Sequence, residues 1–291
     1  MKASWLLLFL TLVLPLPVAA QQQGSVDSRC TNGNEVACID WENGVAIAIG
    51  SGAPASWANT AAQKNLSARR AAKLDAARNL LELIKGVNLT TSTTMRQAMI
   101  ENDQVQSQVE GRLHSLRPVG QPKYFSDGSV QVRMEASLYQ VVPDNLYIEN
   151  GAVEPREIPP PDGGMVRGGS SAGGVNPDQV YSGLIIDARG TGVTPALSPK
   201  VYDPEGREVY GSAYVSREFA VSQGMAGYVK DMERARNADR VQGNPAVVKA
   251  VRSDGNNNAD LVISQADADA LRAAAQKQTF LREARVMIVL D

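Results

Sequence analysis

The sequence has one histidine, two cysteines and few aromatic residues, which make up 5% of its 291 residues. The histidine, His114, lies in a predicted helix beside Leu113 and Leu116, and no G-x-S-x-G motif supplies a nucleophile that it could activate. With a net charge of −2, the chain also lacks the basic face of a nucleic-acid-binding protein and the polybasic anchor of a lipid-bound one. The sequence therefore predicts no catalytic residue, no metal site, no cofactor and no nucleic-acid partner.

The first twenty residues have the layout of a cleavable secretory signal. Lys2 is followed by a short apolar run that ends at Pro15, and the small residues of Val18–Ala20 precede Gln21. The run is shorter than the roughly 20 apolar residues that cross a bilayer, and no later stretch is as apolar. We therefore expect export, cleavage after Ala20, and a periplasmic or outer-membrane-associated protein without a transmembrane span.

Both cysteines, Cys30 and Cys38, lie in a polar lead-in over residues 21–40. In an oxidising compartment two nearby cysteines usually pair, and closing so short a loop is worth about 2–3 kcal/mol on the chain-entropy model. Free thiols or half of a metal site are the alternatives, although the spacing is not that of a C-x-x-C metal motif. We predict a disulfide that staples the lead-in.

Residues 41–145 predict a first α+β domain, with one sheet and helices on one side of it. Helical spacing of Leu66, Leu74, Ala77, Leu81 and Ile84 predicts a long helix with one apolar stripe. Strict alternation after the Asp127-Gly128 turn predicts a strand with one buried face. The expected β-α-β-α-β-β elements are strand 41–50, helix 61–85, strand 87–94, an amphipathic helix over 95–116 that starts irregularly or runs throughout, and strands 119–125 and 130–141.

A Pro- and Gly-rich linker over residues 146–178 leads to a second α+β domain over 179–291. Ser264 and Asp267 predict the capped start of its last helix. The apolar run 284–290 predicts a terminal strand in the middle of a sheet. The other expected elements are strand 181–188, a hairpin of 198–202 with 207–210, a mostly helical stretch over 219–240, and strands 246–252 and 260–264.

Two places offer side chains for binding. Asp187 and Arg189 follow a predicted strand, where Asp187 is a candidate acid, base or ligand and Arg189 an anion clamp; a local ion pair that fixes the glycine-containing loop is the simpler alternative. Arg69, Arg70 and Lys73 form a basic patch on the first long helix. Such a face is usually only solvated, and the alternative is docking to an acidic protein surface or to peptidoglycan carboxylates.

The helix over 67–85, followed by Gly86-Val87, and the later strand 130–136 resemble the signature of the twenty-kilodalton outer-membrane lipoprotein family. Flagellar FlgP-type proteins and the N-terminal domain of FlgT-type proteins carry a similar pattern. The resemblance covers residues 41–145. It implies a non-enzymatic envelope protein, often outer-membrane associated and sometimes part of a ring around the flagellar motor, with no catalytic residues to transfer. Because the predicted cleavage site has no cysteine, this chain departs from the lipid-anchored members.

We therefore expect a non-enzymatic protein that binds other envelope proteins or a second copy of itself, through sheet edges and the basic helix face. Peripheral contact with a membrane is compatible with this expectation. Two alternatives stay open. One is a periplasmic hydrolase of cell-wall material that works around Asp187 and Arg189, which needs acids of raised pKa. The other is a module that binds a small ligand between the two domains.

Overall fold

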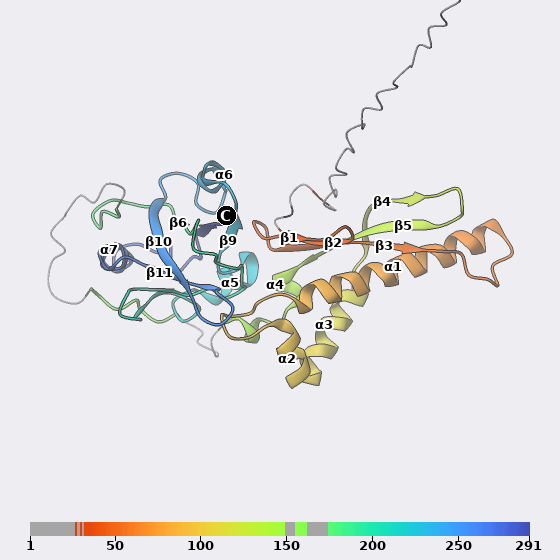
Figure 1. The fold of residues 1–291 in the computed structure, drawn as a ribbon, viewed down its shortest axis with the longest axis horizontal. Coiled ribbons are helices and arrows are strands. Elements are labelled where there is room, and N and C mark those ends of the chain that lie inside the picture. The colour runs from red at the N-terminus through yellow and green to blue at the C-terminus, as the bar shows by residue number, and fades with distance from the viewer. Residues whose placement is uncertain (1–26, 28–29, 31, 149–154, 162–173) are drawn as a thin grey trace, which may run out of the picture.

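The computed structural model describes residue 27, residue 30 and the ranges 32–148, 155–161 and 174–291 (Figure 1). The predicted secretory signal, most of the lead-in before residue 32 and much of the predicted linker lie outside these residues. The chain is an α+β protein with two sheets. No helix in the described ranges combines the length and the apolar character that a bilayer crossing requires.

The first module is an antiparallel sheet with its helices on one face (Figure 1). Its strand order is β1-β2-β3-β5-β4. The alternation predicted for β5 is confirmed, since Val130, Val132, Met134 and Ala136 are buried and the residues between them are partly exposed. The elements are β1 (Asn32–Gly33), β2 (Ala37–Asp40), β3 (Val45–Gly52), α1 (Ala61–Lys85), α2 (Met95–Glu101), α3 (Asp103–Ser115), β4 (Pro118–Tyr124), β5 (Val130–Ser137), α4 (Leu138–Val141) and the 3-10 turn η1 (Asp144–Leu146).

Helix α1 has the predicted bounds, and the C-terminal part of the predicted stripe is buried at Ala77 and Ile84, but its N-terminal part is not. Leu66 and Leu74 are exposed, at 52% and 55% of their surface. The face toward the sheet carries the alanines Ala68, Ala72 and Ala76. The sheet offers small residues in return, because the side of β3 that joins the same core is Ala46, Ala48, Gly50 and Gly52.

The glycines of β3 set how closely α1 approaches. A Cβ placed on Gly50 would lie 2.1 Å from the backbone nitrogen of Ala76, and one on Gly52 would lie 2.3 Å from the carbonyl oxygen of Ala68. The helix backbone therefore rests directly on the strand, where a side chain of any size would keep the two apart. Leucine on this face would hold α1 away from the sheet, which explains why Leu66 and Leu74 point elsewhere.

Three predicted boundaries in the first module are wrong. The expected strand 41–50 starts at Val45, because residues 41–44 form a turn in which Gly44 has φ +65°, while β1 and β2 lie inside the predicted lead-in. The expected helix 95–116 is broken at Asn102, whose side chain accepts hydrogen bonds from the next helix, α3. Strand β5 ends at Ser137, where the chain turns into α4.

The second module holds a seven-stranded mixed sheet of order β8-β7-β11-β10-β6-β12-β9. Strands β6 and β12 pair in parallel, and β12 lies between β6 and the edge strand β9. The terminal strand is therefore interior, as expected, but the middle strand of the sheet is β10. Helix α7 starts at the predicted cap, since Ser264 accepts from the backbone of Asp267. The elements are β6 (Leu184–Asp187), β7 (Val201–Tyr202), β8 (Glu208–Tyr210), α5 (Arg217–Gln223), β9 (Gly227–Val229), α6 (Met232–Asn237), β10 (Ala246–Asp254), β11 (Asp260–Ile263), α7 (Gln265–Ala275) and β12 (Val286–Val289).

The predicted helical stretch 219–240 is wrong in its middle. Gly224, at φ +79°, ends α5, and the chain then adds β9 to the edge of the sheet beside β12 before α6 begins. Residues on one side of β6 and β12, such as Ile185 and Met287, pack with Ala235 of α6. Residues on the other side, such as Ile186 and Ile288, belong to the main core. Because β6 and β12 are buried on both faces, the sequence of each strand is a continuous apolar run.

The segment 87–94, predicted as a strand of the first sheet, instead connects the two modules. Its backbone oxygens accept hydrogen bonds from the second module: Asn88 from Leu197 at 3.0 Å, Leu89 from Ser198 at 2.9 Å, and Thr91 from Asn257 at 2.8 Å. Within its own module the segment makes one isolated bridge, between Asn88 and Thr94. The backbone oxygens of this extended segment are therefore hydrogen-bonded by residues that lie more than 100 positions further along the chain.

Further contacts dock the modules against each other. Trp41 packs edge-on against Tyr228, with ring centroids 5.6 Å apart, and its carbonyl accepts from the Tyr228 backbone. Glu42 forms an ion pair with Arg234 at 2.6 Å. One hydrophobic cluster includes buried residues of both modules. We conclude that the modules form a continuous body.

The contact between α1 and β3 predicts the effect of one added methyl group. Gly50→Ala should lower the free energy of unfolding by about 2 kcal/mol or more, because the new Cβ meets backbone atoms that cannot rotate away. The matched control is Gly111→Ala on α3, where a Cβ meets nothing within 4 Å; it should stabilise by about 0.5–1 kcal/mol. Urea denaturation measures both, and equal effects would contradict this account.

Candidate functional site

Asp187 and Arg189 form a closed local pair. Asp187 ends β6, and its two oxygens accept from Nε and Nη2 of Arg189 at 2.8 and 2.7 Å. The hydrogen bond from Arg189 lowers the pKa of Asp187 below its usual range. This direction suits a permanent carboxylate and not a general acid. The following turn is fixed as well, because the backbone N–H of Gly190 donates to Asp291 at 2.7 Å. The geometry of the pair thus fits the simpler interpretation, in which the ion pair fixes the conformation of the loop that follows β6.

The basic patch of α1 lies on an open helix face. Arg69 and Arg70 are exposed and Lys73 is half-buried, and none of the three forms an ion pair with a described residue. Leu66, Arg70 and Leu74 follow each other at four-residue spacing, so they share one side of the helix. We call Leu66, Arg69, Arg70, Lys73 and Leu74 the outer stripe of α1.

The structure does not bring the two predicted binding places together. The N-terminal half of α1 lies at the end of the molecule farthest from the second module, whereas Asp187 ends a strand of that module (Figure 1). Trp57, which precedes α1 and is 63% exposed, adds a further apolar side chain ahead of the helix. The outer stripe and the Asp187–Arg189 pair are therefore separate features.

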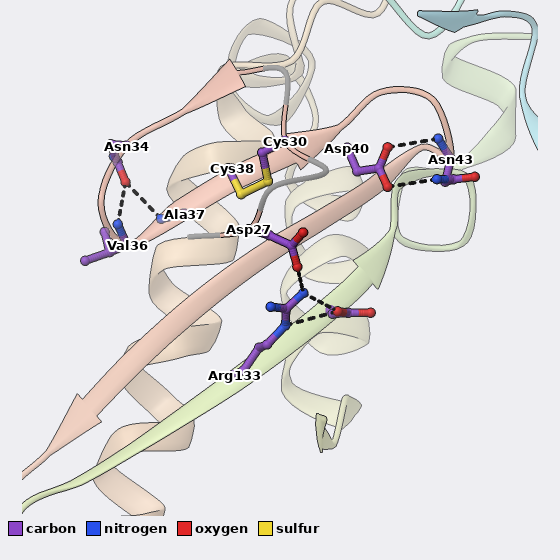
Figure 2. Close-up of a disulfide and its surroundings, with 10 residues drawn as sticks. Asp27, Cys30, Asn34, Val36, Ala37, Cys38, Asp40, Asn43 and Arg133 are labelled. Carbon is purple, nitrogen blue, oxygen red and sulfur yellow. Dashed lines mark hydrogen bonds and ion pairs between the residues drawn. A yellow bond between two sulfur atoms is a disulfide. The ribbon is translucent and has the colours of Figure 1, made fainter. Parts of the chain in front are cut away.

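The two cysteines are paired, as predicted, with 5.8 Å between their Cα atoms. Cys38 belongs to β2, so the disulfide ties the lead-in to the first sheet (Figure 2). Asp27 of the lead-in makes a second connection to the sheet, through an ion pair with Arg133 of β5 (Figure 2). Arg133 also forms an ion pair with Glu135, at 2.6 Å. Both contacts are structural and leave no thiol for chemistry.

The sheet edges, which were expected as docking surfaces, are short or interrupted. Edge strand β4 is largely exposed, but it contains Pro118 and Pro122 and a register shift between Val119 and Lys123, where Gly120 has φ +73°. Prolines and bulges are the usual means of preventing strand addition. In the second sheet, edge strand β9 donates its Tyr228 N–H to Trp41 of the first module. Helix α1 therefore presents the more open surface.

A cleft of about 560 Å³ separates parts of the two modules. Trp41 and Asn88 line it from the first module, and Gly192–Pro195 with Lys230 line it from the second. The loop that follows Arg189 thus forms one wall. Trp41 is almost fully buried, and its indole nitrogen has no hydrogen-bond partner among the described residues.

A smaller and more polar pocket, of about 370 Å³, lies where segment 87–94 meets β7 and β11. It is lined by Thr90, Thr91, Ser92, Asn145, Leu146, Tyr147, Ile148, Ser198, Lys200, Tyr202, Ser212 and Asp260. We call this the hydroxyl pocket. Nothing in the sequence pattern marked these residues, because the pocket forms only where distant segments of the two modules dock.

Asp260 is the buried charged group of the hydroxyl pocket. It is 4% exposed, and one of its oxygens accepts from the Lys200 backbone at 2.9 Å. Burial raises the pKa of Asp260 to about 6, against the opposing effects of that hydrogen bond and of the Lys200 charge. Lys200 itself lies 3.1 Å from Glu208. Within the described residues, no three His, Cys, Asp or Glu side chains gather as metal ligands would.

Comparison with known proteins gives a partial likeness. Residues 183–291 match the family model described as Treponema pallidum Tp0624, second domain. The match covers the second module from the start of its sheet to the last strand and leaves the first module uncovered. No curated protein matches the chain.

The raised pKa of Asp260 predicts a pH-dependent stability. Between about pH 4 and pH 6 the folded chain holds a proton that the unfolded chain has lost, so this group's contribution falls as pH rises through about 6. Asp260→Asn keeps the oxygen that accepts from Lys200 and removes the buried charge. Relative to the wild type, it should gain up to about 3 kcal/mol between pH 4 and pH 7.5 in thermal or urea unfolding.

The exposed Asp127 provides the control, because hydrogen bonds from Ser129 lower its pKa. Since its carboxyl is ionised in both the folded and the unfolded chain over most of this pH range, Asp127→Asn should keep a nearly constant difference in stability from the wild type. An Asp260→Asn variant that loses stability relative to the wild type as pH rises would contradict the account of Asp260.

Proposed function

We propose that this protein is an exported, non-enzymatic component of the cell envelope that binds other envelope proteins or a second copy of itself. Its place is the periplasm or the periplasmic side of the outer membrane, with peripheral membrane contact included, and a flagellar assembly is one setting of this kind. The outer stripe of α1 is the proposed contact surface.

The outer stripe is the observation that carries this proposal. The fold buries the alanine face of α1 against β3, so neither Leu66 nor Leu74 is needed for the core. Leu66 and Leu74 instead place exposed alkyl groups beside basic side chains that form no ion pair with a described residue. Alkyl groups flanked by cations complement a partner whose apolar surface is rimmed by acids.

Other features support a binding role over catalysis. The disulfide suits an oxidising compartment. The hydrolase alternative relies on Asp187, whose pKa is lowered and whose oxygens are both engaged by Arg189. The match of residues 183–291 to the model of a Treponema pallidum domain assigns no chemistry to the second module.

Charge reversal of the outer stripe tests this proposal. The wild type should either self-associate in size-exclusion chromatography with light scattering or co-sediment with purified envelope fractions, and salt should weaken the binding because exposed charges are screened. The triple variant Arg69→Glu, Arg70→Glu, Lys73→Glu should bind about tenfold more weakly or not at all, since it replaces attraction by repulsion.

The matched control reverses three exposed basic residues elsewhere, Arg117, Arg236 and Lys249. It should bind as the wild type does. A wild-type protein that remains a strict monomer and binds no envelope fraction, or a control that loses binding to the same extent as the stripe variant, would refute the proposal.

A further inference from the structure

The hydroxyl pocket contains two serines whose hydroxyl groups bond none of the other residues that the structure describes. Ser198 precedes β7 and is 2% exposed, and Ser212 follows β8 and is 6% exposed. Neither hydroxyl bonds a described residue, although both side chains line the pocket. Neither oxygen is among the fully buried polar atoms that lack a partner, so both are open to the space of the pocket. A ligand in the pocket can therefore replace water as their hydrogen-bond partner.

The lining is rich in hydroxyl groups. Ser198, Ser212 and Tyr202 each contribute one, and so does the segment 90–92, in which Thr90 and Ser92 bond each other and Thr91 donates to the Asp254 carbonyl. Each hydroxyl both donates and accepts, so the lining matches a ligand whose own groups do the same. Asp260 adds a carboxylate that accepts only, and one of its oxygens is engaged by the Lys200 backbone. Hydroxyl and carboxylate groups of this kind form hydrogen bonds with the hydroxyl groups of an alcohol.

Charge in the pocket disfavours an anion. Lys200 is the cation of the lining, and Glu208 lies 3.1 Å from its Nζ. Asp260 places a further negative charge in the same pocket at neutral pH, because its pKa is about 6. A phosphate or carboxylate ligand would therefore meet a cation that is already neutralised, beside a buried anion.

Apolar surface completes the lining. The first module contributes Leu146, Tyr147 and Ile148, and the second module contributes the ring of Tyr202. An aromatic ring presents a flat apolar face, which suits the C–H face of a sugar ring. The volume of about 370 Å³ lies within the usual range of small-molecule pockets, about 300–1,000 Å³.

We infer that the hydroxyl pocket binds a small, neutral, polyhydroxylated ligand of the saccharide class, with Ser198, Ser212 and Asp260 as the groups that hold its hydroxyls. This site goes beyond the proposed binding of envelope partners and does not depend on the outer stripe of α1. Because Thr90–Ser92 come from one module and Ser198 and Asp260 from the other, the ligand contacts both modules at once.

The test is calorimetric titration of the purified protein with glucose, galactose, N-acetylglucosamine and maltose. At least one of these sugars should bind saturably. Ser198→Ala and Ser212→Ala should each weaken that binding by about tenfold, while the unfolding midpoint without sugar stays unchanged, because these hydroxyls bond no described residue. Ser222→Ala, on the exposed face of α5, is the matched control and should bind as the wild type does.

Three results would overturn the inference: no saturable heat with any of the four sugars, equal affinity in Ser198→Ala, Ser212→Ala and the wild type, or tighter binding of inorganic phosphate or glycine than of every sugar. The triple variant of the outer stripe should retain sugar binding. Its result separates the two proposals, since a failure of the pocket leaves envelope binding untouched and the reverse also holds.

Discussion

The first module depends on the contact between the alanine face of α1 and the glycines of β3. With Gly50 and Gly52 opposite Ala68, Ala72 and Ala76, helix and strand meet at backbone distance over about two turns. Polar contacts fix the same arrangement, since Asp75 accepts from the Ser51 backbone at 3.0 Å and Asn79 donates to the Ile49 carbonyl at 2.8 Å. Because these small residues allow only one close packing arrangement, the helix occupies one defined position on the sheet.

The position of α1 on the sheet also determines which part of the molecule lies next to its C-terminal end. The helix ends at Lys85, and Gly86 leads directly into the segment 87–94, whose backbone bonds to the second module. At Gly255 an added Cβ would lie 1.8 Å from the Thr91 hydroxyl oxygen, so the backbone of the second module packs directly against the Thr91 side chain. Both ends of the connection thus rely on glycine. The cleft beside Trp41 and the hydroxyl pocket exist only because this docking is close.

The sequence predicted the elements whose signals are local. The apolar spacing of α1 predicted its bounds, and the alternation of β5 predicted its start, although the strand ends four residues before the predicted 141. Segment 87–94 was assigned to the first sheet and strand β9 was missed, because their hydrogen-bond partners lie far away in the chain. The candidate side chains divide in the same way. Charged groups such as Arg70 and Asp187 are visible in the sequence, whereas Ser198 and Ser212 gain meaning only from the pocket around them.

A ligand at the boundary of two docked modules acts on the docking itself. A molecule that contacts Thr90–Ser92 and Asp260 together binds the docked form and not a form in which the modules are apart, so it stabilises the former by an amount that grows with its concentration over Kd. The outer stripe of α1 lies on the module that the segment 87–94 ties to this boundary. Since α1 is held rigidly by β3, its orientation relative to the second module follows the docking. A ligand in the pocket therefore adds to the free energy that holds the two modules together, while the outer stripe, which does not line the pocket, stays as it is.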